Sequence, residues 1–242
     1  MSASRIDDLQ AFYILLARLR DHVGGARLLG ECDGRSGWPA RGVYFFLEDG
    51  ETRAHSGDGP RVVRVGTHAL KVGAASTLWG RLSQHRGQHG TGGGNHRGSI
   101  FRAIVGASLM ADCGYRVATW NKGASAAAAV RTAERHLEQD VSRVIGAMRV
   151  LWLAIEDAPG PDSLRGFIER NSIALLSNFG KPAFDPPSET WLGRRCNRER
   201  VRTSGLWNSN HVHEPYDSSF LEVLTRLIDE AQLSGSPIAR SG

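Results

Sequence analysis

The segments RGVYFFLEDG (residues 41–50) and RVVRVGTHAL (residues 61–70) decide the fold. Each contains a short run of aromatic and β-branched residues, which favour strands, and a polar, glycine-containing segment joins the two runs. This pattern predicts a β-hairpin with a long loop. Gly42 begins the first run and Gly66 ends the second, and both need an explanation because glycine weakens a strand.

One further strand pattern and several helical patterns occupy the rest of the chain. The run RVLWLAIED (residues 149–157) is apolar, short and bounded by charge, which favours a buried strand. Periodic apolar residues and end signals predict helices over residues 7–20, from about Thr77, over 125–148, from Asp162 or Ser163 to Gly180, and over 218–232. The expected fold class is α/β (α+β), with a small three-stranded antiparallel sheet flanked by helices.

A chain of 242 residues with 40% hydrophobic residues is long enough to bury the core of one globular domain. We expect that core to come from residues 41–86 and 148–180. Residues 87–147 are expected to form a helical insertion between these two parts. Residues 1–40 and 181–242 are expected to be extensions of the same domain.

The composition favours a protein of the reducing cytoplasm. Three cysteines lie far apart without CxxC spacing, which argues against a disulfide framework and a zinc knuckle. The N-terminal segment lacks the order of a signal peptide, and no run reaches the roughly 20 apolar residues that a membrane span needs. The net charge is +5 and arginine dominates the cations. A polyanionic partner and a soluble protein from an organism that favours arginine and glycine fit this composition equally well.

The chain also offers the three groups that phosphodiester hydrolysis requires, namely a carboxylate for a divalent metal ion, a cation for the phosphate and a base. Glu169 lies at the edge of a predicted buried helix, and Arg81 lies on the helix after the hairpin. Tyr44, His68 and His85 are candidate bases. A single glutamate is sufficient, because Mg²⁺ keeps most of its waters and often takes one or two carboxylates.

The order of these residues carries a resemblance to a known family. Gly42-Val43-Tyr44 opens the first strand, Val65-Gly66 closes the second, Arg81 and His85 follow four apart in a helix, and Glu169 and Asn178 come after the third strand. This set resembles the GIY-YIG nuclease superfamily. It is most similar to the restriction-endonuclease branch, in which a histidine follows the arginine by four residues.

The resemblance implies a metal-dependent endonuclease acting on DNA, less readily on RNA, in defence or repair. It implies that Glu169 binds Mg²⁺ or Mn²⁺ and that Arg81 steadies the phosphate. Tyr44 and His85 would serve the attacking water, with Asn178 as a further site residue. It also implies that the two strand glycines leave the tyrosine hydroxyl accessible to a phosphate. Cleavage of both strands at a symmetric site would suggest a homodimer.

Arg64 departs from the family pattern, because a tyrosine usually begins the second motif. Either Tyr44 and a histidine, His68 or His85, transfer the proton without it, or the site is altered. Arg64 could instead donate hydrogen bonds to a phosphate. The alternative function is a nucleic-acid-binding module whose nuclease site has lapsed.

Two further segments are candidates for DNA contacts. The glycine-rich segment of residues 87–99 predicts a mobile loop that carries Asn95, His96 and Arg97, and asparagine and arginine can pair with base edges. The arginine-rich segment carries Arg194, Arg195 and Arg198, which suit phosphate contacts.

A third hypothesis is a zinc-containing interaction protein built around His211 and His213. A structural zinc site needs about four ligands, and no cysteine stands nearby in the sequence. A polar turn before the last helix is therefore the favoured interpretation of these two histidines.

Overall fold

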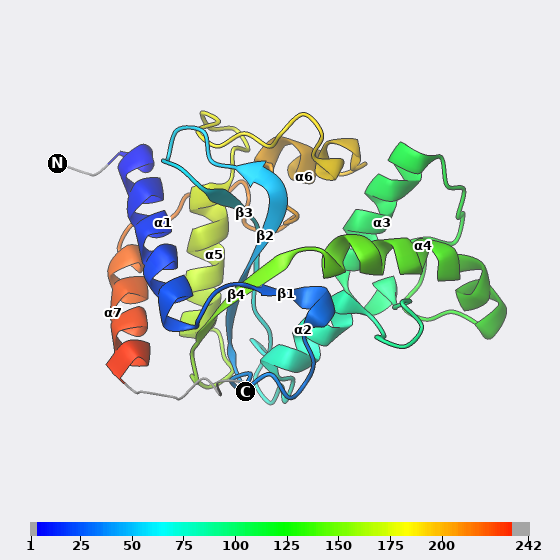
Figure 1. Ribbon diagram of the computed structural model, residues 1–242, viewed down its shortest axis with the longest axis horizontal. Coiled ribbons are helices and arrows are strands. Elements are labelled where there is room, and N and C mark those ends of the chain that lie inside the picture. Colours follow the sequence, from blue (N-terminus) through cyan, green and yellow to red (C-terminus); the bar gives the residue numbers. More distant parts are fainter. Residues whose placement is uncertain (1–3, 234–242) are drawn as a thin grey trace.

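The computed structural model describes residues 4–233 and has the predicted α/β class. Its centre is an antiparallel sheet with helices on both faces (Figure 1). The strand order is β1-β4-β2-β3, with bounds β1 Arg27–Leu28, β2 Gly42–Thr52, β3 Pro60–Gly66 and β4 Arg149–Ala154. The predicted count of three strands is one too low, because the two-residue β1 is too short to produce a sequence pattern.

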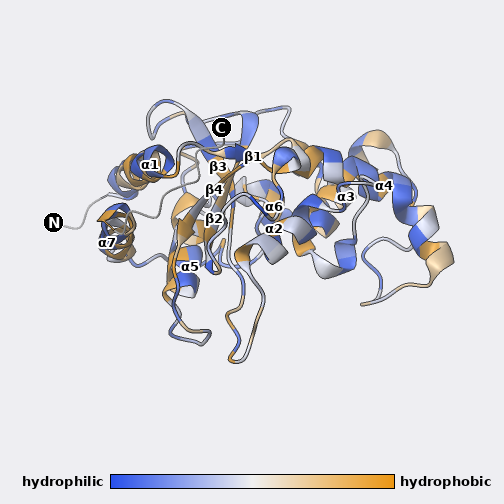
Figure 2. Cartoon of the chain, turned by 60° about the horizontal axis from the view of Figure 1, so that its bottom comes forward, coloured by the Kyte–Doolittle hydropathy of each residue, from blue (hydrophilic) through white to orange (hydrophobic). Residues whose placement is uncertain are grey.

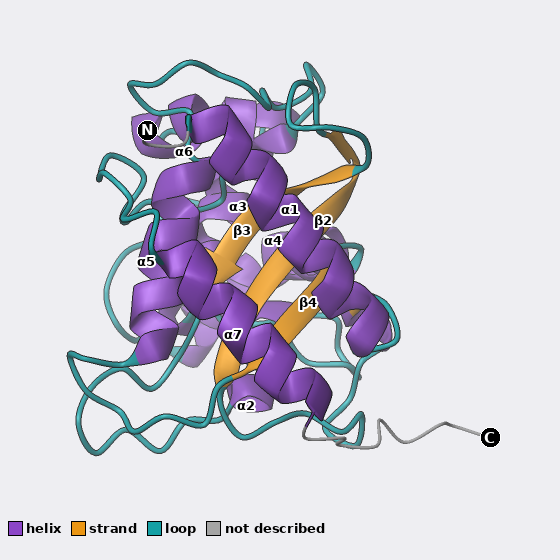
Figure 3. Ribbon diagram, turned by 90° about the vertical axis from the view of Figure 1, so that its left-hand side faces the viewer, coloured by secondary structure: helices purple, strands orange, loops and turns teal. Residues whose placement is uncertain are grey.

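The helices fall into two groups that cover opposite faces of the sheet (Figures 1 and 3). One group is α1 (Arg5–His22), α5 (Leu164–Leu176) and α7 (Phe220–Leu233). The other is α2 (Leu78–Arg86), α3 (Ile100–Cys113), α4 (Ala128–Gly146) and the short α6 (Glu199–Ser204). Three 3-10 turns, η1 (Leu29–Glu31), η2 (His96–Gly98) and η3 (Leu192–Arg195), complete the ordered elements.

Strand β2 is central, because it pairs with β3 on one side and β4 on the other. Its side chains alternate between the two faces, as expected for a strand. Phe45 meets Phe12 of α1 at 5.9 Å between ring centroids, whereas Phe46 meets Phe101 of α3 at 5.4 Å. The sheet is therefore buried on both faces, and apolar residues gather along it and along the inner sides of the helices (Figure 2).

Local sequence signals fix the ends of the helices next to the hairpin and the third strand. The Thr77 side chain accepts the Gly80 N–H at 3.0 Å and so caps α2, as predicted. Ser163, rather than Asp162, caps α5 by accepting the Gly166 N–H at 3.5 Å. Within residues 4–233, no helix combines the length and the apolar character needed to cross a membrane.

Phe12 tests how α1 is held on the sheet. The side chain is fully buried between Phe45 and Phe220. Phe12→Ala should lower the free energy of unfolding by about 3–5 kcal/mol, because it removes apolar contacts and leaves a cavity. Urea denaturation monitored by circular dichroism measures the change.

The matched control is Ile14→Ala, two residues away on the same helix, where the side chain is 63% exposed. This control should change the free energy of unfolding by no more than about 0.5 kcal/mol. Equal effects of the two substitutions would contradict the packing of α1 described above.

Candidate active site

Tyr44 and His85 meet on the face of the sheet that α2 and α3 cover. The Tyr44 hydroxyl lies 2.8 Å from Nε2 of His85, and both side chains are buried. Nδ1 of His85 lies 2.7 Å from Oγ of Ser99, the residue that caps α3. Burial, together with the nearby charges of Arg64 and Arg81, holds the pKa of His85 well below its usual value. The imidazole is therefore neutral at pH 7.

Gly66 is needed because the ring of Tyr44 lies across it. These two residues are paired on adjacent strands, and a Cβ atom at Gly66 would lie 2.3 Å from the Tyr44 hydroxyl oxygen. Gly42 has a similar reason, since a Cβ there would lie 2.4 Å from the carbonyl oxygen of Leu153 in β4. The expectation that the glycines expose Tyr44 is wrong, because Tyr44 is 1% exposed.

Glu169 on α5 is held at the end of β3. Its Oε1 accepts the backbone N–H of Thr67 at 3.1 Å, directly after the last residue of the strand. Within residues 4–233, Oε2 of Glu169 accepts no hydrogen bond, and the residue lines a cavity of about 540 Å³. Burial raises the pKa of this carboxyl above its ordinary value, and the nearby Arg64 opposes the rise.

Arg64 is a buried cation beside this group. Its guanidinium donates to the Trp207 carbonyl, lies 4.6 Å from the centre of the Phe101 ring and interacts with the Tyr44 hydroxyl. Within residues 4–233, no carboxylate lies within ion-pair distance of it, and its Nε has no hydrogen-bond partner. Burial lowers the pKa of Arg64, as expected for a charge that is taken out of water without a counter-ion.

Arg81 and His68 lie at the edge of the same site. Arg81 is half-buried and donates to Gln84 at 3.1 Å and to the Gly98 carbonyl at 3.2 Å. His68 lies 2.9 Å from the carbonyl of Ser76 through Nδ1, which must carry the proton because a carbonyl only accepts. Its Nε2 is therefore unprotonated, and it has no partner in the described part of the chain.

The comparison with known proteins now decides the family. The model of the GIY-YIG domain family matches residues 3–234. The chain belongs to the GIY-YIG domain family. No curated protein and no solved structure matches it. GIY-YIG domains are nuclease domains, so the family points to a nucleic-acid substrate.

Asn178 does not join the other residues predicted for the site. It follows Glu169 by nine residues and lies beyond the end of α5, which closes at Leu176. Its side chain donates to the Asp185 carbonyl at 3.1 Å and accepts from Arg5 at 3.4 Å. These contacts place it beside α1, away from the Tyr44–His85 pair.

Two predicted DNA contacts, His96 and Arg97, are instead turned into the protein. His96 is buried, stacks on Trp120 at 3.8 Å and is 2.9 Å from Glu138. Arg97 makes two hydrogen bonds to Glu134, and its side chain is 4% exposed. Both side chains hold η2 against α4, so neither is free to reach a base.

The remaining candidates for DNA contacts lie nearer the surface. Asn95 caps η2 by accepting the Arg97 N–H at 3.1 Å. Arg194 is exposed and donates to two backbone carbonyls, whereas Arg195 pairs loosely with Asp112 at 3.4 Å. Arg198 is half-buried at the start of α6. The structure leaves the two exposed arginines available to solvent.

His211 is a residue whose position the sequence did not indicate. It lines the same cavity as Glu169, has a φ of 63° and places Nδ1 2.9 Å from Glu214. A closed zinc site is not formed, because residues 4–233 contain no group of three or more histidine, cysteine or acidic side chains that could hold a metal ion. The alternating histidines were a visible signal, but the contact of His211 with this cavity depends on the tertiary fold.

Gly66→Ala tests the close contact of Tyr44 with β3. The added methyl group would overlap both the hydroxyl oxygen and Cζ of Tyr44. We expect a loss of about 1–3 kcal/mol in the free energy of unfolding, because an overpacked core must shift the ring. Gly90→Ala is the control, since a Cβ there meets nothing within 4 Å. An unchanged stability of Gly66→Ala would contradict the position of the ring.

His68 should make the stability of the fold depend on pH. Burial lowers the pKa of His68 from 6.5 to about 4. Between these values the unfolded chain binds a proton that the folded chain does not, so this contribution is present above pH 6.5 and is lost as the pH falls toward 4. His68→Gln should therefore lose less stability on acidification than the parent protein.

Urea titrations at about pH 8, 6 and 4.5 measure this difference. At pH 8 the imidazole is neutral in the folded and the unfolded state. The difference in the free energy of unfolding between variant and parent at that pH therefore serves as the reference. A constant offset at all three pH values would show that His68 does not carry the effect.

Proposed function

We propose that this GIY-YIG protein is a metal-dependent endonuclease that hydrolyses phosphodiester bonds in DNA. One observation carries the proposal. The charges of Arg64 and Arg81 act both on His85, which is hydrogen-bonded to Tyr44, and on a single carboxylate, Glu169. A role in defence or repair follows from the family resemblance alone.

The free oxygen of Glu169 fits a hard divalent cation such as Mg²⁺ or Mn²⁺. One carboxylate oxygen accepts the Thr67 N–H, and the residue lines the 540 Å³ cavity. A magnesium ion keeps several waters and needs only one or two protein carboxylates, so this donor set is sufficient. When bound, the ion would polarise the phosphate and stabilise its developing charge.

Tyr44 and His85 are the pair that would serve the attacking water, and both are buried, so a shift of the surrounding side chains would have to admit it. His85 is neutral at pH 7 because burial lowers its pKa, so one ring nitrogen donates a hydrogen bond and the other accepts one, with Tyr44 and Ser99 as the two partners. Its hydrogen bonds to Tyr44 and Ser99 fix the orientation of the ring. His68 offers a second unprotonated nitrogen at the edge of the site.

The arginines are suited to the charge of the phosphate. Arg81 lies at the edge of the site, where its guanidinium is partly accessible. Arg64 is buried without a carboxylate partner, so its positive field extends into the site. Both would stabilise the additional negative charge of the pentacoordinate transition state.

Glu169→Gln tests the proposed function most directly. The substitution keeps the shape of the side chain but removes the charge that would bind the metal ion. We expect cleavage of supercoiled plasmid in Mg²⁺ or Mn²⁺ to fall by about a hundredfold or more, since a bound metal ion contributes several kcal/mol to the transition state. Gel analysis of nicked and linear products measures the rate.

Glu222→Gln is the matched control, because Glu222 is exposed on α7, and it should cleave like the parent protein. Cleavage by Glu169→Gln at the parental rate would refute the role of Glu169. If the parent binds DNA but cuts it in neither metal, the protein is instead a binding module, with Arg64 marking the lapsed site.

A further inference from the structure

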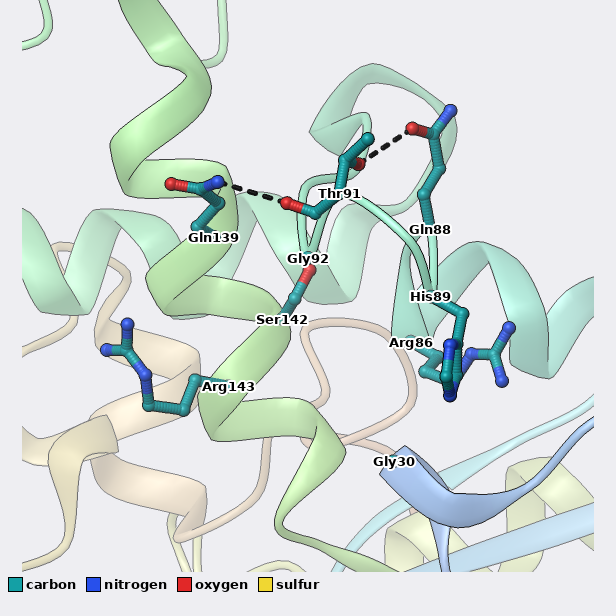
Figure 4. A pocket seen from close by; sticks show the side chains of 9 residues that line it. All are labelled: Gly30, Arg86, Gln88, His89, Thr91, Gly92, Gln139, Ser142 and Arg143. Atoms are coloured by element: carbon teal, nitrogen blue, oxygen red, sulfur yellow. Dashed lines mark hydrogen bonds between the residues drawn. The ribbon is translucent and has the colours of Figure 1, made fainter.

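Two polar cavities lie on either side of the glycine-rich segment that connects α2 to η2. One, of about 500 Å³, lies between this segment, η1 and α4 (Figure 4). The other, of about 640 Å³, lies between the segment, the end of α2 and the start of α4. Gln88 lines both cavities, so they adjoin.

The residues that line these cavities have an unusual composition. They include no acidic residue, no residue with an aliphatic side chain, and no phenylalanine, tyrosine or tryptophan. The side chains that remain are arginine, glutamine, asparagine, histidine, serine and threonine. This set can donate hydrogen bonds to phosphates and pair with base edges, whereas it offers no apolar side chain to an apolar ligand and no carboxylate to a cation.

The glycine-rich segment is packed in one conformation rather than loosely attached. A Cβ at Gly94 would lie 2.2 Å from the guanidinium carbon of Arg102, and a Cβ at Gly87 would lie 2.6 Å from Oγ of Ser142. Gln139 donates to the Thr91 carbonyl at 3.0 Å (Figure 4). The segment therefore forms a fixed ridge between the two cavities.

The ridge and its cavities continue directly from the candidate active site. Arg81 donates to Gln84 and to the Gly98 carbonyl, both of which line the larger cavity. Gln84 and Arg81 lie one turn apart on α2. A chain of phosphates that passes Arg81 would therefore reach the ridge next.

Arg131 at the start of α4 is the free cation of this surface. It is exposed, and its side chain has no partner within residues 4–233. Arg143 is also exposed, although it pairs with Asp140 at 2.6 Å. Arg86 is less available, because it donates to the Cys32 and Gly87 carbonyls and lies over Trp79.

We propose that this surface, formed by the ridge of residues 87–98 and the facing side of α4, binds the DNA duplex next to the scissile phosphate. The inference rests on the proposed nuclease function, and it states where the part of the substrate beside the cleaved bond would bind. Arg131 and Arg143 contact phosphates, and Gln84 and Gln88 face the base edges. The occupant is a duplex rather than a single strand, because single-strand sites stack bases on aromatic side chains, and the lining has no Phe, Tyr or Trp.

The test measures the affinity of the full chain for a short DNA duplex by fluorescence anisotropy, with EDTA present so that no cleavage occurs. The dissociation constant is measured over a range of salt concentrations for the parent, Arg131→Gln, Arg143→Gln and the double variant. Each lost phosphate contact should reduce the slope of log affinity against log salt by about 0.9. The double variant should therefore lose about 1.8 from the slope.

Arg226→Gln is the matched control, because Arg226 is an exposed arginine on α7, on the opposite side of the sheet. Thermal melting of each variant establishes that it is folded. Gln88→Ala should leave the salt slope unchanged but reduce the difference in affinity between duplexes of different sequence.

Slopes for both arginine variants equal to that of Arg226→Gln would overturn the proposal, as would tighter binding of an RNA duplex of the same sequence. Cleavage is measured separately in Mg²⁺. A parent that cuts DNA while the arginine variants keep the parental slope refutes the surface alone. A parent that does not cut while the slopes fall refutes the nuclease function and retains the binding surface.

Discussion

The contact of the Tyr44 ring with Gly66 is the constraint on which the rest of the site depends. Because the ring crosses to the neighbouring strand, its hydroxyl reaches His85 on α2 at 2.8 Å. The same imidazole meets Ser99, which begins α3. One aromatic side chain in the central strand thus links the sheet, α2 and the helices of residues 87–147, and the missing Cβ of one glycine permits this arrangement.

Arg64 differs from other buried arginines of the core in lacking a carboxylate partner among the described residues. Three other buried arginines each have a carboxylate partner: Arg61 pairs with Glu51, Arg102 with Glu138 and Arg165 with Asp157. Arg64 has no such partner among the described residues. A buried cation without a counter-ion costs stability unless an anion approaches it. The proposed nuclease function would offset that cost, because a bound phosphate would supply the missing negative charge beside Arg64.

The sequence predicted the parts of this structure that depend on local patterns. The alternation in the hairpin, the Thr77 cap and the apolar run of β4 each produced the expected element. The two-residue β1 and the contacts of Asn178 beside α1 could not be predicted in this way. Pairing of so short a strand, and the direction in which the chain leaves α5, depend on contacts between residues that are far apart in the sequence.

The DNA-contact segment shows why residue type alone is a poor guide to a surface. His96 and Arg97 have suitable side chains, yet Glu134 and Glu138, one turn apart on α4, draw them inward. Arg131 lies one turn before Glu134, nearer the start of the same helix, and stays exposed. From the sequence alone, Arg97 and Arg131 are equally good candidates for a phosphate contact. The position of the buried glutamates on α4 determines which arginine forms an internal ion pair and which remains free to bind an anion.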